Sequence, residues 1–141
     1  MRVENQLHPS AERAVAFFDG ADDGPFVMVN LLKFREKAAY ADGSDAELSG
    51  RDAYLRYGIA VRGEIEKVGG RTGYAGPVTG LMLGEVDDLW DMVALAEYPS
   101  LAAMREMVMS ASYQVIARHR DAGLAGQLNI KARGSLAGDG A

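Results

Sequence analysis

One order of elements, strand–helix–strand, occurs twice along this chain. In the first half an apolar strand-like run is followed by an amphipathic helical pattern and a glycine-rich strand-like run, and the second half has the same order. The six segments are residues 25–34, 52–68, 71–83, 89–98, 101–120 and 124–131. This order predicts the split βαβ plan, in which two βαβ units share one sheet.

The fold class follows from this plan. We predict an α+β fold, namely a ferredoxin-like βαββαβ domain with an antiparallel four-stranded sheet, over residues 25–133. Residues 1–24 are expected to form an N-terminal helical extension, because Ser10 can cap a helix over residues 9–18. The glycine-rich residues 134–141 are expected to be a disordered tail.

The composition argues against several classes of partner and site. The 141 residues carry a formal net charge of −5, which disfavours nucleic acid or an anionic membrane as the main partner. There is no cysteine, and His8 and His119 are the only histidines, so one chain lacks the nitrogen and sulfur ligands of a zinc site. We therefore predict no metal site and no cofactor. Without an apolar run of membrane-spanning length or an apolar signal core, the expected location is cytoplasmic.

The first predicted strand is apolar on both faces. Alternation places Phe26, Met28, Asn30, Leu32 and Phe34 on one face, and the opposite face is also largely apolar. The predicted helices can cover only one face of a four-stranded sheet. The other face must then meet a partner, so the sequence predicts a homodimer.

Asn30 interrupts the apolar row of this strand. A buried amide needs hydrogen-bond partners, because an unpaired one costs about 1–3 kcal/mol. One interpretation is an amide bonded to neighbouring backbone or helix residues. The other is an amide that faces a cavity and orients a ligand there. The sequence leaves both open, and we treat Asn30 as a candidate substrate-binding residue.

His119 is the candidate catalytic residue, because an imidazole titrates near neutral pH and suits proton transfer. The alternative is a surface histidine near a helix C-terminus, where a positive charge is favourable in any case. Arg120 beside it is a candidate substrate-binding residue that can hold a carboxylate through its guanidinium fork.

Three aromatic residues complete the candidate substrate-binding set. Tyr54 and Tyr57 share a helical face, where a core role is the alternative to hydroxyls that reach a cavity. Trp90 alternates with apolar residues on the third predicted strand, and core or interface packing is its alternative role. The polar residues 35–50 form a long loop, which is either a solvated segment or a lid over the site.

Several segments together resemble the domain of unknown function 1330 family. They are Val27-Met-Val-Asn-Leu-Leu-Lys-Phe34, Gly50-Arg-Asp-Ala-Tyr-Leu-Arg-Tyr57, Trp90-Asp91 with Tyr98-Pro-Ser100, and Ser112-Tyr-Gln-Val-Ile-Ala-Arg-His-Arg120. The resemblance implies a dimeric α+β barrel, in which two ferredoxin-like subunits join their sheets. That superfamily contains cofactor-free monooxygenases, muconolactone-type isomerases, haem-dependent enzymes and plain binding proteins, so the resemblance supports the fold more than a reaction.

Two functional hypotheses follow. The first is a homodimer that binds a small organic molecule in an apolar cavity and can act on it without a cofactor, as a monooxygenase- or isomerase-like enzyme. The second is a non-catalytic binding or structural homodimer, in which the polar residues serve only folding and assembly. A cavity lined by both Asn30 and His119 would favour the first, and a filled core would favour the second.

Overall fold

A computed structural model describes residues 1–22 and 24–138 of the chain. Four strands and four helices are assigned in this part of the chain. In chain order they are α1 (Ala11–Phe18), β1 (Phe26–Phe34), α2 (Gly50–Lys67), β2 (Arg71–Pro77), β3 (Met92–Tyr98), α3 (Leu101–Met109), α4 (Ala111–Gly123) and β4 (Leu124–Arg133). After α1, this is the predicted βαββαβ order, with the second helix in two pieces.

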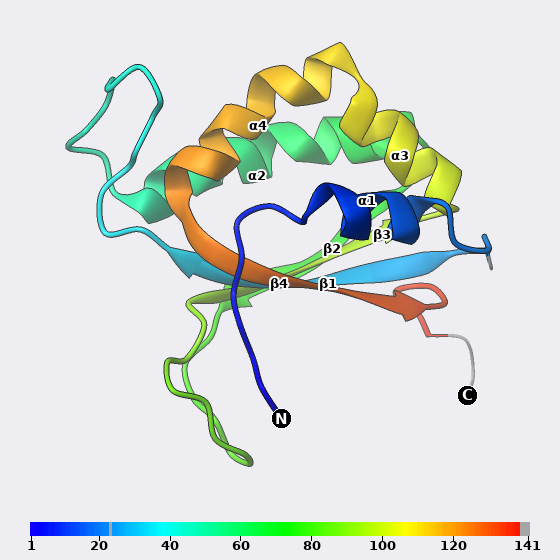
Figure 1. Cartoon of the computed structure of the whole chain (residues 1–141), viewed down its shortest axis with the longest axis horizontal. Helices are drawn as coiled ribbons and strands as arrows, with labels where there is room; N and C mark the ends of the chain where they lie inside the picture. Colours follow the sequence, from blue (N-terminus) through cyan, green and yellow to red (C-terminus); the bar gives the residue numbers. More distant parts are fainter. Residues whose placement is uncertain (23, 139–141) are drawn as a thin grey trace.

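The strands form one antiparallel sheet in the order β2-β3-β1-β4. This order, with β1 and β3 in the centre, is the ferredoxin-like arrangement, and it confirms the predicted fold class. All four helices lie on the same side of the sheet, and no described helix covers the opposite side (Figure 1). The sheet therefore has a covered face and an open face.

Serine residues mark the helix starts. The side chains of Ser10, Ser49, Ser100 and Ser110 each accept a hydrogen bond from an amide in the first turn of α1, α2, α3 and α4. Ser110 adopts an extended backbone conformation, which separates α3 from α4 within the predicted helical segment 101–120. At the end of α2, Gly69 takes a φ of +85°, a conformation that favours glycine.

The segment between β2 and β3 differs from the prediction. The sequence predicted strands over 71–83 and 89–98, but pairing stops at Pro77 and resumes at Met92. Residues 78–91 instead form a long excursion that leaves the sheet on the side away from the helices (Figure 1). One more backbone hydrogen bond follows the last pair, from the Val78 amide to the Asp91 carbonyl at 3.0 Å. On the other strand, the Asp91 carboxylate accepts the Phe34 amide at 2.8 Å in place of a backbone partner.

The 35–50 loop is anchored by its own buried residues. Ala38 and Tyr40 pack against Ala53 of α2 and Ala122 of α4, and the Ala39 amide donates to the Ala122 carbonyl at 2.9 Å. This cluster lies at the end of the helix layer where α4 meets β4. The loop therefore serves as packing for the ends of α2 and α4.

The chain after β4 also has contacts. The Leu136 amide donates to the Glu97 carboxylate at 2.7 Å, and the Leu136 side chain lies against Gly73 of β2. Residues 134–138 thus lie against the edge of the sheet. The remainder of the predicted disordered tail, residues 139–141, lies outside the described residues.

Candidate binding site

A cavity of about 460 Å³ lies between α2 and the covered face of the sheet. Its apolar wall comes from the strand residues Met28 and Ala96, from Val61 and Ile65 of α2, and from Met107 of α3. These residues belong to the main core cluster. The core of this domain is therefore incompletely filled, and the space is large enough for a small organic molecule.

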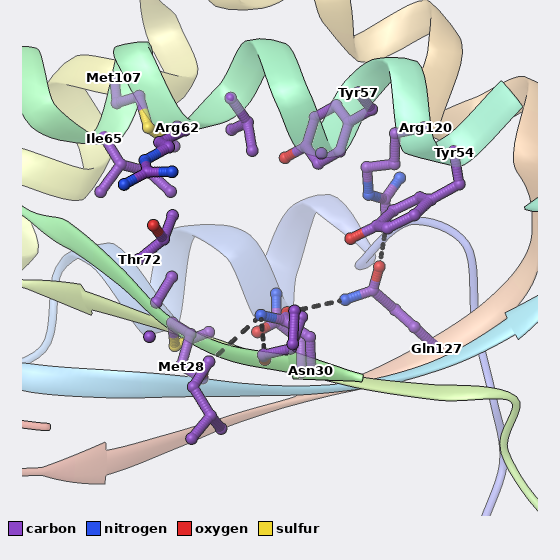
Figure 2. Close-up of a pocket in the computed structure, with 18 of the residues that line it drawn as sticks. Met28, Asn30, Tyr54, Tyr57, Arg62, Ile65, Thr72, Met107, Arg120 and Gln127 are labelled. Atoms are coloured by element: carbon purple, nitrogen blue, oxygen red, sulfur yellow. Dashed lines mark hydrogen bonds between the residues drawn. The ribbon is translucent and has the colours of Figure 1, made fainter. Parts of the chain in front are cut away.

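One end of the cavity is polar (Figure 2). Asn30 lies on its floor, where its amide nitrogen donates to the Ala94 carbonyl at 3.1 Å. The Asn30 oxygen accepts from the Gln127 amide at 3.2 Å, and the Gln127 oxygen accepts from Arg120 at 3.0 Å. Arg120 also donates to the Leu7 carbonyl at 2.6 Å. The amide of Asn30 therefore has neighbouring partners and also lines a cavity, so both sequence interpretations describe part of its environment.

Tyr54 projects into the same end from α2 (Figure 2). Its side chain contacts the Phe34 and Tyr57 rings, and only 7% of the residue is exposed. Its hydroxyl has no hydrogen-bond partner among the described residues. Burial raises the pKa of this hydroxyl to about 12, with the nearby Arg120 charge opposing the shift. A buried protonated hydroxyl without a partner is a donor available to a ligand.

The other tyrosines at the cavity differ in this respect. The Tyr57 hydroxyl is 3.0 Å from the Tyr113 hydroxyl, which joins α2 to α4. Burial raises the pKa of Tyr57 and of Tyr98 well above the ordinary value for tyrosine. The side chains of Tyr54, Tyr57 and Tyr98 therefore stay neutral near pH 7.

The position of Tyr54 depends on close contact between α2 and α4. A Cβ atom on Gly123 would lie 2.5 Å from the Gly50 carbonyl oxygen and 2.6 Å from the Tyr54 amide nitrogen. Glycine at position 123 therefore allows the end of α4 to press against the start of α2. This contact brings Tyr54 and Arg120, from different helices, to one end of the cavity.

The cavity opens between α2 and the edge strand β2. Ile59 and Arg62 of α2 and Gly73 of β2 are exposed lining residues, whereas the lining residues of β1 and β3 are more buried. β2 is an edge strand, so no further strand closes the sheet on this side. A molecule entering here would reach the Tyr54 end along the axis of α2.

His119 lies elsewhere. Its Nδ1 atom is 2.6 Å from the Tyr40 hydroxyl, in the cluster formed with the 35–50 loop, and it does not line the cavity. Burial lowers the pKa of His119, and the charges of Arg118 and Arg56 lower it further, against the effect of Asp45. The structure therefore does not bring the predicted catalytic histidine together with Asn30.

Trp90 is also away from the cavity. It precedes β3 in the 78–91 excursion, and its indole nitrogen donates to the Asn5 side chain at 2.7 Å. Together with the Arg120–Leu7 bond and two backbone hydrogen bonds between Gln6 and Gln127, this contact ties the N-terminal segment across β4.

The structure adds residues that the sequence reasoning missed. Gln127 links Asn30 to Arg120, and Tyr113 holds Tyr57. Gln127 lies on a predicted strand that also carries Asn129 and Lys131, so it did not stand out from its neighbours as Asn30 did. Tyr113 follows a helix break and carried no comparable signal.

The cavity lining has no group that titrates near neutral pH among the described residues. The described lining of this cavity contains neither a carboxylate nor a histidine. Over residues 1–22 and 24–138, no three side chains of the metal-ligating types gather as a metal site would require. No helix in the same part of the chain has the length and apolar character to cross a membrane.

The comparisons with known proteins come from solved structures. The chain is 33% identical to RPA0582, a protein of unknown function from Rhodopseudomonas palustris, over 94% of this chain and 98% of that one, with a TM-score of 0.81. The chain belongs to the same family as RPA0582. The structure of methylated RPA0582 gives the same identity, with a TM-score of 0.82 over 93% of this chain and 96% of that one.

More distant structures resemble this chain only weakly. A dimeric protein of unknown function with a ferredoxin-like fold, from Bacteroides fragilis, is 10% identical, with a TM-score of 0.47 over 78% of this chain and 96% of that one. That likeness is too low to carry an argument. No protein-family model and no curated protein matches the chain. Membership of the domain of unknown function 1330 family therefore stays a prediction.

Proposed function

We propose that this protein binds a small organic molecule in the cavity between α2 and the sheet. The observation that carries the proposal is the Tyr54 hydroxyl, which belongs to a buried residue, has no hydrogen-bond partner among the described residues and opens onto an apolar space of about 460 Å³. Because the hydroxyl is reached from the cavity, a molecule held there can serve as its hydrogen-bond partner. Asn30, Tyr57 and Arg120 belong to the same site as wall and orienting residues.

The residues that line the cavity favour binding of a molecule over acid–base catalysis by this chain. The described lining has no group with a pKa near 7, and His119 is bonded to Tyr40 outside the cavity. A cofactor-independent reaction in this site would need its reactive group on the bound molecule or on a partner subunit. A cytoplasmic location also stays a prediction.

We further propose that the protein is a homodimer joined through the open face of the sheet. The strand registers place six apolar side chains together on this face, on the three strands β1, β3 and β4: Val29, Leu31, Val93, Leu95, Leu128 and Ile130. No described helix covers them, and an apolar sheet face of this kind needs a second layer. A second copy of the same face is self-complementary in chemistry.

The binding proposal is tested by filling the cavity. A library of small organic fragments is screened by ligand-observed NMR against the wild type and against Ala94→Leu, which adds bulk to the cavity floor. The matched control is Ala125→Leu, at an exposed strand position outside the cavity. We expect a set of fragments that compete with one another and lose binding only in Ala94→Leu. If no fragment depends on Ala94, the proposal is wrong.

The dimer is tested by sedimentation equilibrium. The subunit mass is 15.1 kDa, and we expect the wild type to sediment as twice that mass. Leu31→Glu places a charge at the centre of the open face and should yield monomers, with folding checked by circular dichroism. Val115→Glu, at an exposed position of α4, is the control that should remain dimeric. A monomeric wild type would refute the dimer.

A further inference from the structure

The polar end of the cavity is rich in donors and poor in free acceptors. The Tyr54 hydroxyl is unpartnered among the described residues. An arginine has five N–H donors, and Arg120 makes three hydrogen bonds to described residues, with Asp121, Leu7 and Gln127. The Asn30 oxygen, in contrast, already accepts from Gln127. A ligand group placed here must mainly accept hydrogen bonds.

The charge at this end is also positive. The Arg120 side chain is only 16% exposed, and its one ion pair among the described residues is with Asp121, whose side chain is 42% exposed. Because that carboxylate is well solvated, it screens the guanidinium only in part. The Nη2 donors are already used by Leu7 and Gln127, so the free donors of Arg120 are single N–H groups on Nε and Nη1. The positive charge of a mostly buried arginine favours a carboxylate acceptor over a neutral one.

The remaining length of the cavity is mainly apolar. Tyr54 and Ile65, both lining residues on α2, are eleven positions apart, which corresponds to about 16 Å along a helix axis. The wall between the two ends carries Val61, Met28 and Ala96, and Ile65 and Met107 lie at the far end together with Arg62 (Figure 2). The Arg62 side chain is 70% exposed and paired with Glu66, whereas Arg120 is mostly buried. The space thus has one buried cationic, donating end and a long, mainly apolar remainder that reaches the solvated Arg62.

We propose that the ligand is a small monocarboxylic acid with an apolar body, whose carboxylate accepts hydrogen bonds from Tyr54 and Arg120. This inference rests on the proposed function, because it assigns a chemical class to the molecule in the same cavity. The apolar body lies toward Ile65 and Met107. Burial keeps the Tyr54 hydroxyl protonated, so it remains a donor when the carboxylate is bound.

The experiment uses three probes with the same apolar body and different headgroups: 3-phenylpropanoate, 3-phenylpropanamide and 3-phenylpropylamine. Their dissociation constants are measured by NMR titration at pH 7 with the wild type. We expect the acid to bind about tenfold more tightly than the amide, as a charge-assisted hydrogen bond implies, and the amine to bind most weakly.

Variants of Tyr54 and Arg120 test whether the preference for the acid depends on these two side chains. Tyr54→Phe should reduce the preference for the acid over the amide severalfold, and Tyr74→Phe, which changes an exposed tyrosine outside the cavity lining, should not. Arg120→Gln should abolish the preference, with its folding confirmed by thermal unfolding. Restoration of the preference by Arg120→Lys would show that the charge itself is required.

The outcomes separate this inference from the proposed function. Equal binding of acid and amide, tighter binding of the amine, or no binding of the acid would overturn the carboxylate assignment. None of these results bears on the fragment experiment with Ala94→Leu, which tests binding of any molecule in the cavity. Absence of any fragment that depends on Ala94 would be the failure of the proposed function.

Discussion

Tyr40 and Tyr54 lie in two clusters that look alike in composition but differ in hydrogen bonding. Each tyrosine is 7% exposed, and each lies close to arginine side chains at the end of the helix layer where α4 meets β4. The Tyr40 hydroxyl is 2.6 Å from His119 Nδ1 and accepts from Arg56 at 3.3 Å. The Tyr54 hydroxyl has no such partner among the described residues. Equal burial therefore does not mean an equal role.

The difference separates a structural cluster from a candidate site. At Tyr40 the protein supplies the partners itself, and the contacts fasten the 35–50 loop to α2 and α4. At Tyr54 the protein supplies donors beside empty apolar space. A hydroxyl that has no protein partner and opens onto an apolar cavity is a donor that a ligand can use. The presence of histidine and arginine in a cluster therefore indicates a ligand site less reliably than a polar side chain that lacks a protein hydrogen-bond partner.

The largest expected effect comes from Gly123→Ala, which acts on both clusters. The added Cβ would meet the Gly50 carbonyl and the Tyr54 amide, and the Gly123 carbonyl also accepts from Arg35 at the start of the loop. We expect a loss of about 2–3 kcal/mol in the free energy of unfolding, measured by urea denaturation. Gly58→Ala is the control, because a Cβ added there would meet nothing within 4 Å and a helical alanine should stabilise α2 by about 0.5–1 kcal/mol.

The comparison itself is tested by Tyr40→Phe and Tyr54→Phe, which remove one oxygen from equally buried residues. Tyr40→Phe leaves the half-buried His119 Nδ1 without its partner, while Arg56 keeps Asp45, so the free energy of unfolding should fall by about 1–2 kcal/mol. Tyr54→Phe removes no hydrogen bond within the described residues and should change stability by less than about 0.5 kcal/mol. Equal losses in the two variants would mean that Tyr54 is a structural residue as well.

Asn30→Leu examines how the polar end of the cavity is held. The change leaves the Gln127 amide without its acceptor, and Gln127 in turn contacts Arg120. We expect a loss of about 1 kcal/mol in stability, because the Gln127 side chain can turn toward cavity water. The loss in binding free energy for 3-phenylpropanoate should exceed the loss in the free energy of unfolding, because the Arg120 donors lose their fixed direction. Unchanged binding would remove Asn30 from the site.

The smallest expected effect is a pH dependence confined to the Tyr40 cluster. Because the pKa of folded His119 is lowered, the unfolded chain binds a proton more readily, and stability is lost as pH falls below the unfolded value of about 6.5. Denaturation at pH 7.5 and 5.5 should show a smaller drop in His119→Gln than in the wild type. A wild-type drop that His119→Gln leaves unchanged would show that other groups titrate.

Much of the fold was predictable because it is encoded over short distances in the chain. The alternation in β1, the capping serines, the break at Ser110 and the end of α2 at Gly69 each depend on neighbouring residues. The predicted strand 71–83 was too long, because the local pattern of apolar residues at 81–83 suggests a strand. Pairing with β3 ends at Pro77, and Leu83 and Met82 are exposed.

The sequence by itself determined the order of elements, the sheet they form and the polar oddity at Asn30. Only the tertiary structure decided which polar residues meet. Gln127 reaches Asn30 from a strand 97 residues away, and Arg120 joins them because Gly123 lets α4 approach α2. His119, next to Arg120 in sequence, points to Tyr40 instead, since adjacent residues on a helix do not share a face. Local patterns specify elements, whereas a cavity depends on side chains that long-range packing brings together or keeps apart.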